Sequence, residues 1–334
     1  MIKTPEGFIA GVNATMPLVM ADGPAWPYRA LMIDTSRHFL GLDTVRQAII
    51  GMAALKLNVL HWHILDSTSF PVQSEKFPQL SKKGAYAPQA VYSLDDLRGV
   101  VAFARSRGVR VVPEIEMPGH GSFSVGMPEL SLSSCSDVLD VTKNSTYTFL
   151  TEFLQEMTTV FTDELMYLGG DEVGFDPNCT WPGTTKCGYH CFDADPSVAA
   201  WMRRHGLNAT QTLDYFWQQV TAHVVPQLTN KSVGVWMADT PNGAGGREHV
   251  WPPPHMSTLP HDAVANVYQS MATAGPLLDA GTSVVLSVAG SDWYLDYHPD
   301  FAAVYNVRPC DAKLLDCDNP KHPLRRQHLS LIHI

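Results

Sequence analysis

Seven short and almost continuously apolar runs divide the chain, and amphipathic segments separate them. The runs cover residues 29–36, 58–64, 110–117, 165–172, 232–237, 263–269 and 283–289. Strands that are apolar at nearly every position are typical of a parallel sheet covered on both faces. The segments between them carry helix signals: Ser93 can cap a helix that ends before Gly108, and Asp43 can cap an earlier helix. This repeated order predicts an α/β fold, the (β/α)8 or TIM barrel.

The pattern of apolar runs does not predict an eighth strand. No run after residue 289 has the character of the seven before it, and the tail from residue 301 to 334 does not fit a barrel. We therefore predict a TIM barrel that lacks its eighth strand in this chain.

Charge and apolar content exclude two classes of partner. The formal net charge is -10 at pH 7, whereas a nucleic-acid backbone calls for a basic surface. No apolar run approaches the roughly 18 residues of a membrane span. We expect neither nucleic acid nor a membrane span as part of the function.

Sequons and cysteines indicate a secretory route. The first residues show no signal peptide, which by itself would favour a cytosolic protein. Against this, five N-x-S/T sequons are present, and six cysteines form an even set in loop-like sequence. The sequons, which we expect to carry glycans, lie at Asn13, Asn144, Asn178, Asn208 and Asn230.

Polar residues gather where the apolar runs end, and in a β/α barrel these ends share one mouth. The sharpest of these features is GGDEV at residues 169–173. Two glycines allow a tight turn, and the adjacent carboxylates of Asp171 and Glu172 raise the pKa of one of them, as a general acid at near-neutral pH requires. The plainer interpretation of such an acid is a helix N-cap.

His61 and His63 raise the alternative of a metal-dependent hydrolase, because an HxH pair on one strand face can hold zinc. Zinc barrels of that kind carry HxH on the first strand and further histidines on later strands. Here the pair lies on the second strand, and the fifth and sixth strands end in Trp236 and Tyr268. We therefore predict no metal and no cofactor, with His63 in a supporting role.

Four stretches together resemble glycoside hydrolase family 20, the β-N-acetylhexosaminidases of lysosomal type. They are RALMIDTSRHFL (29–40), KLNVLHWHILDSTSFP (56–71), RGVRVVPEIEMPGH (107–120) and YLGGDEV (167–173). The resemblance implies a retaining exo-β-N-acetylhexosaminidase that acts on terminal β-linked GlcNAc or GalNAc of glycoconjugates or chitooligosaccharides. In this family the substrate's own acetamido group is the nucleophile and gives an oxazolinium intermediate.

The resemblance also assigns roles. Glu172 is implied as the general acid and Asp171 as the residue that orients the acetamido group. The remaining residues are implied as substrate-binding or supporting groups: Arg37, Asp66, Glu116, His120, Trp236, Tyr268, Trp293, Tyr294 and Asp296. The family usually has Asp at the position of Glu116 and Trp at that of Tyr268.

Disulfide bonds, domains and location follow from the same resemblance. It implies a Cys135–Cys179 bridge, and Cys187–Cys191 and Cys310–Cys317 are further expected pairs. Residues 1–27 resemble the remnant of an N-terminal domain, residues 28–300 the catalytic barrel, and residues 301–334 an atypical tail. The expected location is lysosomal or secreted, and a dimer is one possible assembly of the full-length protein. The alternative is an inactive sugar-binding fragment, because the family's eighth strand and its Trp-Gly-Glu motif are missing.

Overall fold

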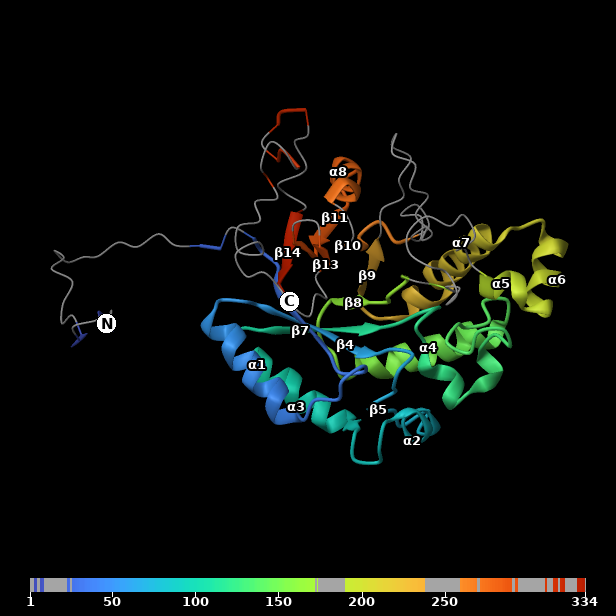
Figure 1. Ribbon diagram of the computed structural model, residues 1–334, viewed down its shortest axis with the longest axis horizontal. Coiled ribbons are helices and arrows are strands. Elements are labelled where there is room, and N and C mark those ends of the chain that lie inside the picture. The colour runs from blue at the N-terminus through green and yellow to red at the C-terminus, as the bar shows by residue number, and fades with distance from the viewer. Residues whose placement is uncertain are drawn as a thin grey trace.

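A closed barrel of eight parallel strands forms the centre of the computed structural model (Figure 1). The structure describes residues 3–4, 7–8, 23–24, 26–171, 173, 190–237, 259–268, 271–289, 292–293, 310, 315–317, 319–321 and 329–333. In chain order the barrel strands are β3 (Arg29–Asp34), β4 (Val59–Leu65), β7 (Arg110–Ile115), β8 (Leu165–Tyr167), β9 (Ser232–Met237), β10 (Val264–Val267), β11 (Ser283–Leu286) and β14 (Leu329–His333). The first seven coincide with the seven predicted runs, with β4 extending one residue further, to Leu65, so the predicted α/β barrel is confirmed.

The eighth strand, β14, comes from the tail, where the sequence predicted none. Leu329 pairs with Val284 of β11, and Leu331 pairs with Arg29 of β3, in parallel register on both sides. The prediction of a missing eighth strand is therefore wrong, and the tail is not wholly outside the barrel. Without β14, the edges of β11 and β3 would present unpaired backbone groups. A short strand can pair with these groups whatever its side chains.

Side chains of the barrel strands alternate between two apolar clusters. Ala30 and Met32 of β3 belong to a small cluster inside the barrel, whereas Leu31 and Ile33 pack against the larger cluster under the helices. Burial on both faces explains the continuous apolar runs. On β4 and β7 the inward positions change from apolar to charged toward the carboxyl end of each strand, which delivers polar groups to the mouth.

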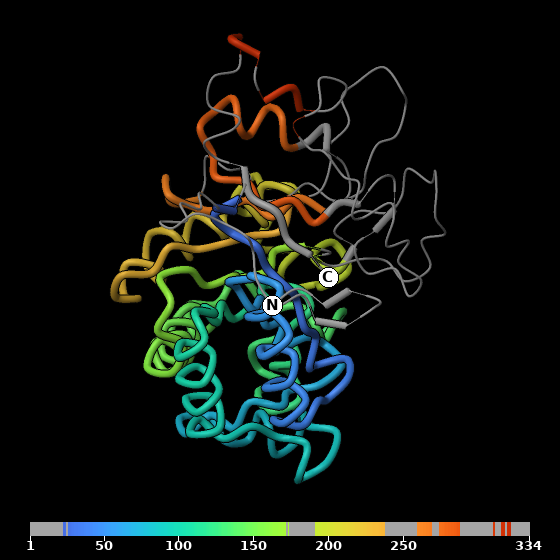
Figure 2. Tube along the Cα trace, turned by 90° about the vertical axis from the view of Figure 1, so that its left-hand side faces the viewer, coloured from blue at the N-terminus to red at the C-terminus, as the bar shows by residue number. Residues whose placement is uncertain are grey.

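Eight α-helices are described, and most of them surround the barrel. They are α1 (Leu42–Ala54), α2 (Gln79–Gly84), α3 (Leu94–Arg105), α4 (Asn144–Thr158), α5 (His190–Ala194), α6 (Pro196–His205), α7 (Ala209–Gln219) and α8 (Met271–Asp279). Figure 2 shows the first half of the chain, blue to green, gathered on one side of the molecule, with α8 and β11 on the other. None of the described helices is long and apolar enough to cross a bilayer.

Helix starts were predicted with mixed success. Ser93 caps α3 in a capping box with Asp96, as expected, and Gly108 has a φ of 72° just beyond the helix end. Asp43 does not cap α1, because Gly41 is the N-cap and Asp43 lies in the first turn. An acid in the first turn also interacts favourably with the helix dipole. The sequence therefore does not distinguish an acid at the N-cap from an acid in the first turn.

The remaining described strands are two-residue pieces outside the barrel. They form three small sheets: β1 (Lys3–Thr4) with β2 (Gly7–Phe8), β5 (Val72–Gln73) with β6 (Tyr92–Ser93), and β12 (Val288–Ala289) with β13 (Asp292–Trp293). The short helical turns are η1 (Ser122–Val125), η2 (Pro128–Leu130), η3 (Val220–Val224) and η4 (Val225–Gln227).

Candidate active site

Arg37 sits at the mouth, directly after β3, between two carboxylates. Its Nη1 lies 2.6 Å from Oδ2 of Asp34, and its Nη2 lies 2.7 Å from Oδ2 of Asp66. Burial would lower the pKa of Arg37, but the charges of Asp66 and Asp34 raise it further above its usual value. The guanidinium is held in one orientation, and the Arg37 side chain remains 38% exposed, so it can still receive a polar ligand.

Asp66 connects three basic side chains although its own side chain is buried. Besides Arg37, it faces His63 Nε2 at 3.2 Å and His120 Nδ1 at 3.5 Å. Burial alone would raise the pKa of Asp66, but the hydrogen bonds from His120 and His63 outweigh it and hold that pKa well below the usual range. The three predicted residues Arg37, Asp66 and His120 are therefore brought together, with Asp66 ionised.

His63 lies between Asp66 and a second carboxylate, Glu114. Its Nδ1 is 2.8 Å from Oε2 of Glu114, while its Nε2 faces Asp66. Burial lowers the pKa of His63, but the charge of Glu114 and the hydrogen bond to Asp66 raise it to about 10. His63 is thus a cation at neutral pH.

Glu116 occupies a pocket that the glycine turn leaves open. A Cβ placed on Gly169, which has a φ of 67°, would lie 1.8 Å from Oε2 of Glu116. Burial raises the pKa of Glu116 well above its usual range, and the charges of Asp171, Glu114 and Asp66 add to that rise. The protonated form of Glu116 is therefore favoured, next to the turn that carries Asp171.

The loop that bears His120 packs against the same turn. A Cβ on Gly119 would lie 3.0 Å from the Cα of Val173, so the two segments approach closely. His120 itself has a φ of 51°, a conformation uncommon outside glycine. Asp171 and His120 are therefore presented by two adjoining segments at one side of the mouth.

Trp236 and Tyr268 form an aromatic pair at the ends of β9 and β10. Both side chains are 2% exposed, and their rings meet edge to face at 5.5 Å. The indole N–H of Trp236 donates to Oε1 of Glu114. The sequence placed both aromatics, and Glu114 as well, at the ends of barrel strands, but it assigned Glu114 no role, because that role depends on contacts across strands.

Several predicted residues lie outside the described part of the chain. They are Glu172, Tyr294, Asp296, Asn13, Asn178, Cys179 and Cys187. Trp293 is described only as a backbone position of β13.

The side chains of His63, Glu114 and Glu116 lie close enough together to hold a metal ion. One potential ligand atom from each lies within 4.8 Å of the others, and all three side chains are buried. Both ring nitrogens of His63 already face carboxylates, however, and a metal ligand must be a deprotonated nitrogen. The contacts of His63 with Glu114 and Asp66 therefore use both of its ring nitrogens.

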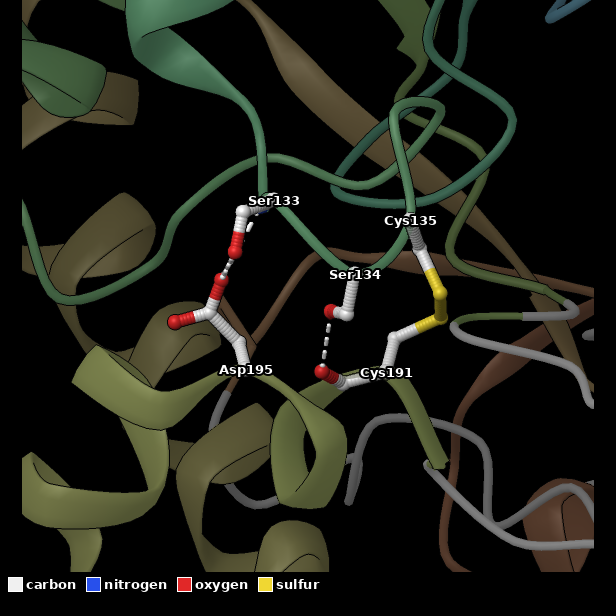
Figure 3. The surroundings of a disulfide bond; sticks show 5 residues. All are labelled: Ser133, Ser134, Cys135, Cys191 and Asp195. Carbon is white, nitrogen blue, oxygen red and sulfur yellow. Dashed lines mark hydrogen bonds between the residues drawn. A yellow bond between two sulfur atoms is a disulfide. The ribbon is translucent and has the colours of Figure 1, made fainter.

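The predicted cysteine pairing is corrected at Cys135. Cys135 bonds to Cys191, with Cα atoms 5.6 Å apart, which rules out both Cys135–Cys179 and Cys187–Cys191 (Figure 3). Ser134 Oγ donates to the carbonyl of Cys191, and Ser133 donates through N and Oγ to Asp195, so the two segments are aligned by side chains beside the bridge (Figure 3). The Cys310–Cys317 pair is confirmed.

Replacing both Cys135 and Cys191 by Ala is expected to lower the free energy of unfolding by roughly 4 kcal/mol, because the bridge spans 56 residues and restricts the unfolded chain. The matched control replaces Cys310 and Cys317, whose separation of 7 residues gives roughly 2.5 kcal/mol by the same relation. Urea unfolding of both variants measures the difference. A larger loss for the short bridge would contradict the expectation.

Three of the predicted glycosylation sites are described, and all are exposed: Asn144, Asn208 and Asn230. Asn208 is also the N-cap of α7, where its Oδ1 accepts from the backbone N–H of Gln211 at 2.8 Å. A glycan attaches to the amide nitrogen, so the cap and the modification use different atoms.

Comparison with known proteins gives one consistent result. The model of "Glycosyl hydrolase family 20, catalytic domain" matches residues 26–313. The β-hexosaminidase subunit β of Mus musculus is 34% identical over 308 residues, which cover 87% of this chain and 51% of that protein. The corresponding Homo sapiens subunit is 35% identical over 304 residues, or 87% and 50%. The chain thus spans about half the length of these relatives.

Solved structures agree on the fold. A family 20 exo-β-N-acetylglucosaminidase from Vibrio harveyi, in complex with N-acetylglucosamine, superposes with a TM-score of 0.68 at 22% identity, covering 93% of this chain and 50% of that one. A family 20 β-N-acetylhexosaminidase from Streptomyces coelicolor gives a TM-score of 0.64 at 20% identity, covering 93% and 59%.

Proposed function

The chain belongs to glycosyl hydrolase family 20, and from that premise we propose that it is the catalytic barrel of a retaining exo-β-N-acetylhexosaminidase. Its substrates are terminal β-linked GlcNAc or GalNAc residues of glycoconjugates or chitooligosaccharides. The observation that carries the proposal is the grouping of Arg37, Asp66, His120 and Asp171 at one mouth of the barrel. Carboxylates and a guanidinium bind sugar hydroxyls. A family 20 site also needs a general acid next to the residue that orients the acetamido group, which is Asp171 in this chain.

The reaction we propose begins with the acetamido group. Its carbonyl oxygen attacks the anomeric carbon, the glycosidic C–O bond breaks, and Glu172 delivers a proton to the leaving oxygen. Asp171 holds the amide N–H while positive charge develops there. Water then adds to the anomeric carbon and opens the ring, Glu172 takes the water's proton, and configuration is retained.

The surrounding residues support this chemistry through charge. The raised pKa of Glu116 disfavours a further negative charge against Asp171. Arg37 is assigned to sugar hydroxyls and Trp236 with Tyr268 to the acetamido pocket. Trp293, Tyr294 and Asp296 are further proposed substrate contacts, by resemblance.

The wider assignments are proposals as well. We assign residues 28–300 to the catalytic barrel and residues 1–27 to the remnant of a preceding domain. We propose a lysosomal or secreted glycoprotein with glycans on the five sequons, and a dimer as the assembly of the full-length protein. The exposure of Asn144, Asn208 and Asn230 supports the glycans.

Product analysis tests the proposed function. A full-length protein that contains this barrel should release single GlcNAc units from the non-reducing end of chitotriose, with the β-anomer appearing first by proton NMR. Activity should survive a chelator, which separates this function from that of a metal-dependent hydrolase. Binding without turnover would favour the inactive sugar-binding alternative, and first appearance of the α-anomer would exclude a retaining mechanism.

A further inference from the structure

One carboxylate inside the barrel, Glu114, receives side chains from two other strands. Its Oε2 lies 2.8 Å from Nε2 of His61 and 2.8 Å from Nδ1 of His63, both on β4. Its Oε1 accepts the indole N–H of Trp236 on β9. The Glu114 side chain is fully buried, where an ionised group is tolerated only with such donors.

We propose that Glu114 is a positioning residue that fixes the charge of His63 and the orientation of Trp236. This inference rests on the function proposed above, because it gives Glu114 a role in the same reaction. Glu114 would touch no substrate and would act through those two neighbours.

The charge of His63 follows from the geometry. A carboxylate oxygen can only accept a hydrogen bond, and both ring nitrogens of His63 face carboxylates, so both must carry a proton. The other titratable or charged groups around His63 come from four segments and include His61, Glu116, Asp34, Arg37, His120 and Asp171. Glu116 lies farther away, at 3.8 Å from Nδ1, so the imidazolium is balanced directly by Glu114 and Asp66.

The orientation of Trp236 follows from its single polar atom. An indole has one N–H donor, so bonding it to Glu114 fixes the rotation of the ring. In that orientation Trp236 stacks with His61, with ring centres 5.9 Å apart, and meets Tyr268 edge to face. The proposed acetamido pocket therefore takes its aromatic pair from a contact with Glu114.

The effect on His63 reaches the mouth by a chain of alternating charges. Arg37 pairs with Asp66, Asp66 with His63, and His63 with Glu114. The negative charge of Glu114 therefore keeps His63 cationic beside Asp66. Asp66 in turn holds Arg37.

The variant Glu114→Gln cannot satisfy all its neighbours. If its amide oxygen faces Trp236, its NH₂ group faces the two histidines, and His63 must then become neutral with Nδ1 as acceptor. If the amide is reversed, NH₂ faces the indole N–H and that bond is lost. We expect kcat on aryl N-acetylglucosaminide to fall roughly tenfold or more, with a smaller change in KM, because one charge-assisted hydrogen bond is worth about that factor.

Glu156→Gln is the matched control. Glu156 is also a buried carboxylate, on α4, and accepts from Ser74 Oγ and the backbone N–H groups of Glu75 and Lys76, outside the site. It should lower stability without changing kcat or KM. An equal loss of kcat in both variants would reduce Glu114 to a structural role and overturn the proposal.

Histidine ¹⁵N NMR at pH 8 provides a readout that does not depend on turnover. The wild-type protein should show an imidazolium signal that is absent in His63→Gln and replaced by a neutral tautomer in Glu114→Gln. A neutral His63 in the wild type would overturn the proposal even if Glu114→Gln failed to fold. If the wild type shows the cation but hydrolyses no N-acetylhexosaminide, the proposed function fails while the charge assignment stands.

Discussion

Glu172→Gln is expected to lower turnover of natural oligosaccharides by roughly 10²–10⁴-fold, the usual contribution of a general acid. An amide cannot deliver a proton to the leaving oxygen. Aryl glycosides with acidic phenols should lose much less, because such leaving groups depart as anions. The measurement compares kcat/KM for chitobiose and a 2,4-dinitrophenyl N-acetylglucosaminide in the wild type and the variant of the full-length protein.

The test compares the loss of kcat/KM on chitobiose with the loss on the dinitrophenyl substrate. Glu152→Gln, on the exposed face of α4, serves as the control for a neutralised carboxylate and should leave both rates unchanged. Equal losses on both substrates would show that Glu172 is not the acid.

A β-glucoside that lacks the acetamido group should be almost inert, because the nucleophile itself is then missing. We expect a rate difference of several orders of magnitude between aryl N-acetylglucosaminide and the matched aryl glucoside, since proximity of an internal nucleophile is worth that much. Thiazoline mimics of the cyclic intermediate should inhibit. Comparable rates on the two sugars would refute the substrate-assisted mechanism.

Asp171→Asn tests the protein's part in the same step. We expect kcat to fall far more than binding of the product weakens, because the charge on the acetamido nitrogen develops only as the ring closes. Asp95→Asn, a change on the exposed side of α3, is the control and should alter neither quantity. A variant that loses binding and keeps kcat would show that Asp171 only contacts the ground state.

Much of the fold was readable because its strands are buried on both faces. Residues 29–36 and 110–117 stand out since inward and outward side chains are both apolar over most of their length. The strand at Leu329–His333 was missed because backbone pairing with β3 and β11 defines it, and such pairing leaves little trace in composition. The cap at Ser93 was predicted correctly because a Ser side chain favours the N-cap position. Asp43 was predicted wrongly because Asp is also favourable in the first turn of a helix.

The site was readable only in part. Strand ends located Arg37, Asp66 and His120, because the barrel brings them to one mouth. The role of Glu114 and the bond between Cys135 and Cys191 depend on which segments face each other in space. Sequence spacing carries no such information, and the partner that the family resemblance implied for Cys135 was the wrong one.

The barrel interior has two unlike halves. Among the described residues, the charged inward groups belong to β4 and β7 and to the segments after β3 and β8, whereas β9, β10 and β11 contribute Trp236, Tyr268, Asn266 and Ser287. Substitutions in the neutral half, other than at Trp236, which donates to Glu114, can reshape the pocket without removing a hydrogen bond from the charged groups. Over evolutionary time, substrate range and pH optimum are therefore traits that such a barrel can alter independently.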